Sequence, residues 1–157
     1  MEIKRALITG ASGQIGSYLC EYLLEKKYKV YGMVRYSTTK TEYINLKNII
    51  NDIEIIEGDI LDESFLNKNM SLIRPNEVYN CSAQSQVRKS FDIPIYTGDV
   101  TGLGVLRVLE AIRNSGFNSK FLQFSTSELF GNSKEYPQNE NTPFNPRSPY
   151  GIAKLYG

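Results

Sequence analysis

Short apolar runs alternate with segments of helical periodicity along most of the chain. Five runs have the length and composition of buried β-strands: Arg5–Thr9, Lys29–Val34, Ile53–Glu57, Glu77–Cys81 and Lys120–Ser125. Between them apolar residues recur every three or four positions, which predicts helices over Gln14–Lys26, about Glu42–Ile50, Asp62–Ile73 and Asp99–Asn114. This order predicts an α/β fold, a doubly wound parallel sheet with helices on both faces and right-handed crossovers.

Residues at the segment ends agree with these boundaries. Acids at Asp62 and Glu63 open one helix, Pro75 follows its end, and Gly116 stands just past the end of another. Three segments lack a regular pattern and are predicted to be loops: 36–41, 82–97 and 131–147. Loops after the carboxyl ends of strands bind ligands in such sheets, and the length of the last one indicates a functional role.

The composition is that of an ordinary globular domain, so we expect one domain over residues 1–157. Hydrophobic residues make up 41% and charged residues 22%, and no stretch approaches the roughly 20 apolar residues of a membrane span. The net charge is +1 without a basic block, which argues against a nucleic-acid partner. Because Met1 runs directly into an apolar strand, we expect no signal peptide and a cytoplasmic protein.

The cysteine and histidine counts limit the chemistry. Cys20 and Cys81 have the spacing of neither a metal site nor a disulfide framework, so we expect both to be reduced and structural, and no metal. There is no histidine. Any acid or base chemistry must therefore come from Tyr, Lys, Glu or Asp.

A glycine-rich stretch lies between the first predicted strand and the first predicted helix. Its glycines permit a tight turn and the close approach of a pyrophosphate, and the helix N-terminus offers free N–H groups. This predicts a Rossmann-type dinucleotide site, held by Gly10, Ser12, Gly13, Gln14, Ile15 and Gly16. The alternative is a plain strand–turn–helix in which the glycines only serve packing.

Two further positions concern the adenosine end of such a cofactor. NAD-specific sites place an acid after the second strand, where it binds the ribose 2′-hydroxyl. This chain has Arg35 there, which would pair with a 2′-phosphate, so NADP is favoured over NAD; a solvated surface arginine is the alternative. After the third strand, Asp59, followed by Ile60, would accept a hydrogen bond from the adenine amino group, or would cap a turn or helix.

Residues with catalytic potential gather near the end of the chain. Tyr150 and Lys154 are four apart, so they share one face of a helix. A nearby ammonium lowers the pKa of a tyrosine from about 10, which favours a tyrosine base for a sugar hydroxyl. Thr126 and Glu128 offer a hydroxyl for the same sugar oxygen and a carboxylate for a carbon-bound proton beside a ketone. Taken singly, these would be a chance pair and a strand end with a helix cap.

Together the motifs resemble the extended short-chain dehydrogenase/reductase family and, within it, the GDP-mannose 4,6-dehydratases. Matching segments cover nearly the whole chain and include Gly13-Gln14, Gly58-Asp59, Ala83-Gln84-Ser85, Ser125-Thr126-Ser127-Glu128 and Pro146-Arg147-Ser148-Pro149-Tyr150-Gly151. The specific element is Thr126-Ser127-Glu128, because related dTDP- and UDP-sugar dehydratases usually carry Thr-Asp-Glu. Epimerases of this fold generally lack the acid.

The resemblance implies a lyase that converts GDP-mannose to GDP-4-keto-6-deoxymannose with a bound NADP that is regenerated in each cycle. Tyr150, assisted by Lys154 and Thr126, would deprotonate the 4-hydroxyl while hydride passes from C4 to the cofactor. Glu128 would remove the C5 proton, and Ser127 or Glu128 would help the C6 hydroxyl leave. The implied cofactor contacts include Ala83, Ser85, Tyr150 and Lys154, and the implied substrate contacts are Gln84, Ser85, Thr126, Glu128 and Tyr150. An ordinary polar loop is the alternative at 84–85.

Some features depart from the family pattern. Tyr36 stands where a second arginine is common, which weakens the preference for NADP, and Gln86 and Cys81-Ser82 replace a usual histidine and Leu-Gly pair. Family members are roughly twice as long, so we expect this chain to be a piece that lacks the substrate-binding part. The resemblance also implies that the full-length protein forms homo-oligomers. The alternatives are another NAD(P)-dependent nucleotide-sugar dehydratase or epimerase, and a cofactor-binding fragment that is inactive on its own.

Overall fold

The computed structural model of the chain describes residues 3–36 and 40–157. Part of the loop predicted at 36–41 therefore lies outside the described residues. The chain divides into two compact units, one made of residues 1–82 and 107–124 and the other of residues 83–106 and 125–157. The single cofactor-binding domain expected over residues 1–157 stays a prediction.

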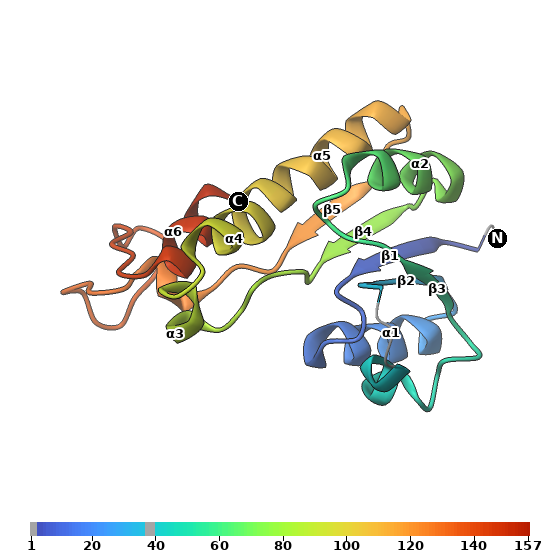
Figure 1. Ribbon diagram of the computed structural model, residues 1–157, viewed down its shortest axis with the longest axis horizontal. Helices are drawn as coiled ribbons and strands as arrows, with labels where there is room; N and C mark the ends of the chain where they lie inside the picture. Colours follow the sequence, from blue (N-terminus) through green and yellow to red (C-terminus); the bar gives the residue numbers. More distant parts are fainter. Residues whose placement is uncertain (1–2, 37–39) are drawn as a thin grey trace. The chain divides into compact units, whose positions relative to one another are not determined.

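The first unit contains a five-stranded sheet in which all neighbouring strands are parallel (Figure 1). Its strands are β1 (Arg5–Thr9), β2 (Lys29–Val34), β3 (Glu54–Glu57), β4 (Glu77–Asn80) and β5 (Lys120–Gln123), in the order β3-β2-β1-β4-β5. The chain winds outward from β1 in both directions, so β1 and β4 flank the topological switch point where ligands bind in such folds. The predicted doubly wound parallel sheet is confirmed.

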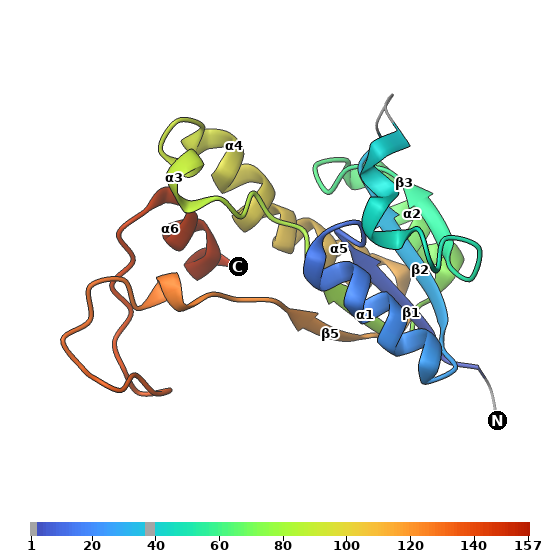
Figure 2. The same cartoon turned by 90° about the horizontal axis from the view of Figure 1, so that it is seen from below.

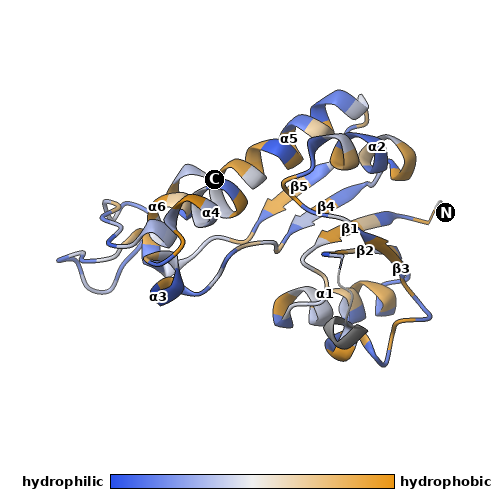
Figure 3. Ribbon diagram, in the orientation of Figure 1, coloured by the Kyte–Doolittle hydropathy of each residue, from blue (hydrophilic) through white to orange (hydrophobic). Residues whose placement is uncertain are grey.

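Helices cover both faces of this sheet (Figures 1 and 2). One face carries α1 (Gln14–Glu25) and the 3₁₀ helix η1 (Lys40–Leu46), and the other carries α2 (Glu63–Ile73) and the end of α5 (Gly104–Ser115). Ala6 and Ile8 of β1 pack in one core cluster with Cys20 and Leu23 of α1, and the strand alternation turns buried Leu7 to the opposite face. Apolar residues accordingly follow the strands and form bands along α1 (Figure 3).

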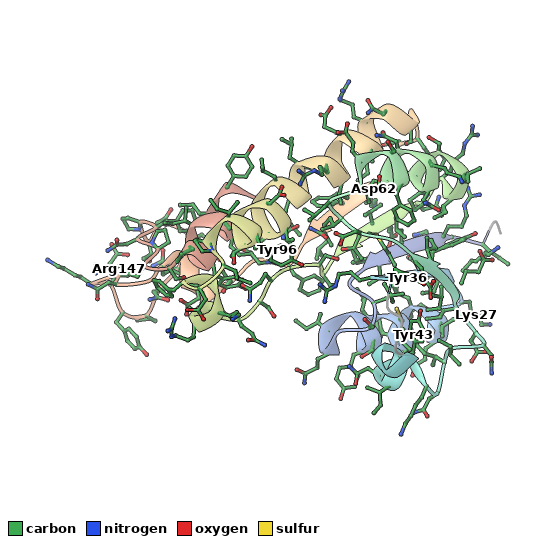
Figure 4. All side chains as sticks on the ribbon, viewed as in Figure 1. Lys27, Tyr36, Tyr43, Asp62, Tyr96 and Arg147 are labelled. Carbon is green, nitrogen blue, oxygen red and sulfur yellow. The ribbon has the colours of Figure 1, made fainter. Side chains whose placement is uncertain are left out.

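The helix boundaries follow the predicted signals. The Asp62 side chain caps α2 by accepting a hydrogen bond from the Phe65 N–H at 2.9 Å. The same helix ends at Arg74, whose φ of 47° is left-handed, immediately before Pro75. Gly116, with φ of 64°, follows the end of α5. Figure 4 labels Asp62 at the start of α2.

The second unit is mainly helical and corrects two predictions. The segment expected to be a loop at 82–97 contains α3 (Val87–Ser90) and α4 (Pro94–Gly98). The helix expected from residue 99 begins earlier, because α4 continues through the π-helical segment η2 (Asp99–Leu103) into α5. Pro94 occupies the first turn of α4, where its missing N–H costs nothing. The unit also contains η3 (Ser127–Leu129) and α6 (Pro149–Tyr156).

In the first unit, the helix predicted over about 42–50 is wrong in type. It is the 3₁₀ helix η1, which is followed by turns. Three predicted strands are also one or two residues too long, because the observed strands run over 54–57, 77–80 and 120–123. No helix within residues 3–36 and 40–157 has both the length and the apolar character needed to cross a membrane.

Within the described residues, neither Cys20 nor Cys81 forms a disulfide. Cys20 is fully buried under the sheet, and this burial raises the pKa of its thiol to about 12. The side chain therefore remains protonated and behaves as a small apolar group of the core.

A chain of polar side chains crosses three strands at their carboxyl ends. The hydroxyl of Thr9 donates a hydrogen bond to Oδ1 of Asn80, and Nδ2 of Asn80 donates one to Oε1 of Gln123 at 2.7 Å. The Thr9 hydroxyl also accepts a hydrogen bond from the Ser82 N–H at 3.2 Å. Thr9 and Asn80 are fully buried, so each of these groups would be costly if left unpaired. The chain thereby ties β1, β4 and β5 together beside the switch point.

We expect the substitution Thr9→Val to lower the free energy of unfolding by about 1–3 kcal/mol, because Asn80 loses a donor and the Ser82 N–H loses an acceptor. Urea unfolding followed by circular dichroism measures this change. Thr9→Ser keeps the hydroxyl and is the control. A Thr9→Val variant as stable as the wild type would contradict this role of the hydrogen bonds, because valine keeps the methyl group and removes only the hydroxyl.

Candidate functional site

The residues predicted to form the site fall into two sets, one in each unit. The glycine-rich loop, Arg35, Asp59 and Ile60 belong to the first unit. Residues 83–85, residues 126–128, Tyr150 and Lys154 belong to the second. Each set has its own local geometry.

The glycine-rich loop lets α1 begin directly against the end of β1. Gly10 has a φ of 66°, and a Cβ there would lie 3.0 Å from the Ser82 nitrogen. Its carbonyl accepts a hydrogen bond from the Gly13 N–H at 3.0 Å. A Cβ on Gly16 would lie only 2.3 Å from that same carbonyl oxygen. A side chain at position 16 would therefore push the helix away from the end of β1, and one at position 10 would collide with the backbone that follows β4.

The N-terminus of α1 is open to an anion. Gly13 is the N-cap residue, no side chain caps the helix, and its first turn contains no acid. The first N–H groups of a helix lack acceptors within the helix and carry partial positive charge, which suits a phosphate. This cradle of uncapped N–H groups fits the pyrophosphate of a dinucleotide. The glycines at positions 10 and 16 lie against the chain's own backbone, so they serve the close packing of the loop.

Two hydrogen bonds hold the loop in place. The Ala11 N–H donates to the Met33 carbonyl of β2 at 3.1 Å. Nδ2 of Asn45, in η1, donates to the Ser12 carbonyl at 2.9 Å. Sequence reasoning missed Asn45, because its partner is a backbone atom 33 residues away and no motif marks the pair.

The residues expected near the adenosine follow β2 and β3. Arg35 is exposed directly after β2, and the next residue, Tyr36, is 72% exposed (Figure 4). Oδ1 of Asp59 accepts a hydrogen bond from the Leu61 N–H at 2.9 Å, so this carboxylate forms the turn that leads into α2. The next residue, Ile60, is buried. The adenine contact of Asp59 stays a prediction.

In the second unit, α6 holds the tyrosine and the lysine on one face, as predicted. Oγ of Ser148 accepts a hydrogen bond from the Gly151 N–H at 3.0 Å, which caps the helix at Pro149. Tyr150 and Lys154 are only 8% and 6% exposed, whereas Ile152 between them is 59% exposed. The helix thus buries together the two side chains that the sequence predicts to be catalytic.

The segment that carries Thr126 and Glu128 packs against the start of α6. Oγ1 of Thr126 caps η3 by accepting a hydrogen bond from the Glu128 N–H at 3.2 Å. A Cβ on Gly151 would lie 3.0 Å from the Glu128 carbonyl oxygen, so η3 touches the helix beside Tyr150. This contact holds the acid-bearing segment next to the tyrosine-bearing turn.

A pocket with a volume of about 580 Å³ opens beside this contact, in the size range of small-ligand sites. Two predicted residues, Ser127 and Glu128, line it. Four others were missed by the sequence reasoning and come from the segment predicted to be a functional loop: Gly131, Asn132, Gln138 and Arg147. For Gly131, Asn132 and Gln138 the unusual length of that loop was the only signal, whereas Arg147 also lay in a segment that matches the family.

The loop between η3 and α6 is closed at its base (Figure 2). The Asn145 N–H donates to the Leu129 carbonyl at 2.9 Å, and the Asn132 N–H donates to the Asn145 carbonyl at 3.3 Å. The rings of Phe130 and Phe144 pack with centroids 5.5 Å apart. The segment is therefore a compact loop whose ends meet, a type of loop that frequently carries function.

The helical run of the second unit holds the segment 83–85. The Gln84 N–H donates to Oγ1 of Thr101 at 3.0 Å, and its side-chain Oε1 accepts from Oγ1 of Thr97 at 3.3 Å. Ser85 is exposed and Ala83 is partly buried. Contacts of these residues with cofactor or substrate stay predictions. The part of the chain that the structure describes contains no group of three or more His, Cys, Asp or Glu side chains that could hold a metal ion.

Solved structures with this fold include nucleotide-sugar enzymes. The UDP-glucose 4-epimerase of Thermotoga maritima, solved with UDP-glucose, matches with a TM-score of 0.85 and 33% identity, over 96% of this chain and 48% of that one. The UDP-glucose 4-epimerase of Brucella ovis, solved in complex with NAD, matches with a TM-score of 0.85 and 26% identity, over 97% of this chain and 45% of that one. The fold is therefore that of the Rossmann-type short-chain dehydrogenase/reductases.

Sequence comparison narrows the class to one family. Residues 7–157 match the family model of GDP-mannose 4,6 dehydratase. The GDP-mannose 4,6 dehydratase of Cricetulus griseus is 51% identical over 98% of this chain and 44% of its own length, and that of Vibrio cholerae is 48% identical over 98% and 43%. The chain belongs to the GDP-mannose 4,6-dehydratase family. It spans less than half the length of these curated relatives.

We expect Gly16→Ala to weaken dinucleotide binding at least about tenfold and to lower the free energy of unfolding by about 1–3 kcal/mol, because the new Cβ overlaps the Gly10 carbonyl. Fluorescence titration with NADPH and urea unfolding measure the two effects. Gly98→Ala is the control. Gly98 has a helical φ of −61° with nothing within 4 Å of a new Cβ, so this variant should gain about 0.5–1 kcal/mol. Unchanged binding in Gly16→Ala would contradict the assignment of the cradle.

Proposed function

We propose that this chain carries the cofactor-binding and catalytic residues of a GDP-mannose 4,6-dehydratase, a lyase that removes water from the hexose of a nucleotide sugar. The main support is the contact between Gly151 of α6 and the Glu128 carbonyl. It keeps a carboxylate beside a helix that buries Tyr150 and Lys154 on one face. Dehydration needs both a base for an O–H group and a base for a C–H group, and this unit offers one of each.

The proposed cofactor is NADP, whose nicotinamide ring, when bound, accepts a hydride from the sugar and later returns it. The N–H groups at the start of α1 would bind its pyrophosphate, and the glycines at positions 10 and 16 let the loop pack closely enough for the helix to start there. Arg35 would pair with the 2′-phosphate. A neighbour of similar fold, the Brucella ovis epimerase, is solved with NAD, so the distinction rests on Arg35.

In the proposed reaction Tyr150 takes the proton of the hexose 4-hydroxyl. Lys154 lies one helical turn further along the same buried face, where its positive charge would stabilise the phenolate. The Thr126 hydroxyl uses its oxygen to accept the Glu128 N–H, which leaves its proton for the sugar oxygen. The sequence contains no histidine, and among the remaining candidate bases we assign Tyr150 to this step because it shares a buried helix face with Lys154.

Glu128 then serves the elimination. Once C4 is a ketone, the proton on C5 becomes acidic, and the Glu128 carboxylate removes it. The C6 hydroxyl leaves as water after it receives a proton from Glu128 or Ser127, and both side chains line the same pocket. In the last step C6 receives the hydride and C5 takes up a proton in place of the one that Glu128 removed, while the C4 oxygen stays a ketone oxygen. The proton that Tyr150 took from the 4-hydroxyl makes up this proton, directly or through solvent, so Tyr150 is ready for the next cycle.

The alternative is a nucleotide-sugar 4-epimerase. Similarity to the Thermotoga maritima UDP-glucose 4-epimerase supports it. Epimerisation at C4 moves no proton at C5 and expels no water, so it gives Glu128 no role. The presence of this carboxylate in the pocket therefore favours the dehydratase.

The protein that carries this sequence should convert GDP-mannose, with NADP, into a product lighter by one water without net consumption of cofactor; mass spectrometry detects it. Glu128→Gln and Tyr150→Phe should each lower kcat by about 10²- to 10⁴-fold, and Glu128→Gln should leave NADPH binding unchanged. Tyr156→Phe, on the exposed side of the same helix, is the control and should be fully active. Formation of an isomer of unchanged mass from UDP-glucose would favour the epimerase instead.

For the cofactor, we expect the wild-type chain to bind NADPH more tightly than NADH, as measured by fluorescence titration. Arg35→Met should weaken NADPH binding about tenfold or more and leave NADH binding unchanged, because only the 2′-phosphate loses a partner. Lys68→Met, which removes an exposed cation from α2, is the control. A wild-type preference for NADH would overturn the assignment of Arg35.

A further inference from the structure

The pocket beside η3 brings two opposite charges together without pairing them. Glu128 and Arg147 both line it, and within the part of the chain that the structure describes no ion pair joins them. A charge that is not neutralised by its neighbour remains available to a ligand. Figure 4 labels Arg147 in the loop that precedes α6.

The base of the loop directs the Arg147 side chain. Gly131 has a φ of 48°, and a Cβ at this position would lie 3.2 Å from Cγ of Arg147 and 2.0 Å from the Asn145 carbonyl oxygen. The aliphatic stem of Arg147 therefore passes over the space that a side chain at 131 would occupy. Because Asn145 is itself hydrogen-bonded to Leu129 at 2.9 Å, the arginine leaves from a fixed segment of backbone.

The remaining lining groups identify the chemistry of the ligand. Besides the two charges, the pocket presents the Ser127 hydroxyl and the amides of Asn132 and Gln138. Such a mixture of donors and acceptors matches the hydroxyl groups of a sugar ring. A diphosphate requires several cations or converging backbone N–H groups, whereas Arg147 is the one cation among the described lining residues.

We propose that Arg147 is a specificity-determining residue that donates hydrogen bonds to hydroxyl groups of the hexose in the pocket it shares with Glu128. This inference rests on the proposed function. A guanidinium presents its N–H donors in a rigid planar fork, so it can reach two neighbouring hydroxyls at once. Arg147 thereby selects the sugar, while Glu128 acts on it.

The test compares the binding of GDP-mannose and of GDP by calorimetry in the protein that carries this sequence. Arg147→Met keeps the stem over Gly131 and removes the guanidinium. It should weaken GDP-mannose binding about 10- to 100-fold and leave GDP binding within about twofold of wild type. Lys134→Met is the matched control, since it removes an exposed cation of the same loop that does not line the pocket, and it should change neither affinity.

Two outcomes overturn the inference. Unchanged GDP-mannose affinity in Arg147→Met shows that the guanidinium does not contact the hexose, and an equal loss for GDP shows that it contacts the diphosphate. Dehydration by the wild type is scored separately. A wild type that binds GDP-mannose but releases no dehydrated product overturns the proposed function, while the ratio between variant and wild-type affinities still decides the role of Arg147.

Discussion

The hydrogen bonds that join Gln123 to the fully buried Thr9 and Asn80 are the constraint on which the candidate site depends. Each of these residues ends a strand, and each strand leads within a few residues to a segment with proposed chemistry: the glycine-rich loop, residues 83–85 and residues 126–128. Fully buried polar groups tolerate little displacement, because any unpaired donor or acceptor costs more than the bond contributes. The strand ends are thus fixed laterally, and the loops that leave them start from defined positions.

Most of the first unit could be predicted from hydropathy. The observed bounds of β1 and β2 match the predicted ones residue for residue, because both strands are continuous apolar runs bounded by charged residues or glycine. The helix predicted at 42–50 was wrong in type, because apolar residues three or four apart suit both an α-helix and a 3₁₀ helix. The chain forms a 3₁₀ helix there. α3 and α4 have four and five residues, too few for a periodic pattern to emerge.

In the candidate site, too, the residues that belong to a local sequence pattern could be predicted and those that depend on distant contacts could not. Residues that belong to a local pattern, such as Gly10, Gly16, Tyr150 and Lys154, could be found because spacing along the chain reflects their geometry. Asn45 and Thr101 could not, since each binds a backbone atom from a distant segment and any polar residue would look the same in the sequence. Arg147 lay inside a recognised motif, but only the closed loop brings it into the pocket with Glu128.

The π-helical segment η2 sets a limit on how the second unit can change. Two threonines hold Gln84. Thr97 lies in α4, just before η2, and Thr101 lies within η2. A π turn contains an extra residue compared with an α turn. Deletion of one residue of η2 would let the run close as a regular α-helix, because the extra residue of a π turn is accommodated locally inside the helix. The backbone that carries Thr101 would then be rebuilt and the Gln84 N–H would lose its acceptor, so a single residue of this helical run determines how the segment 83–85 is anchored.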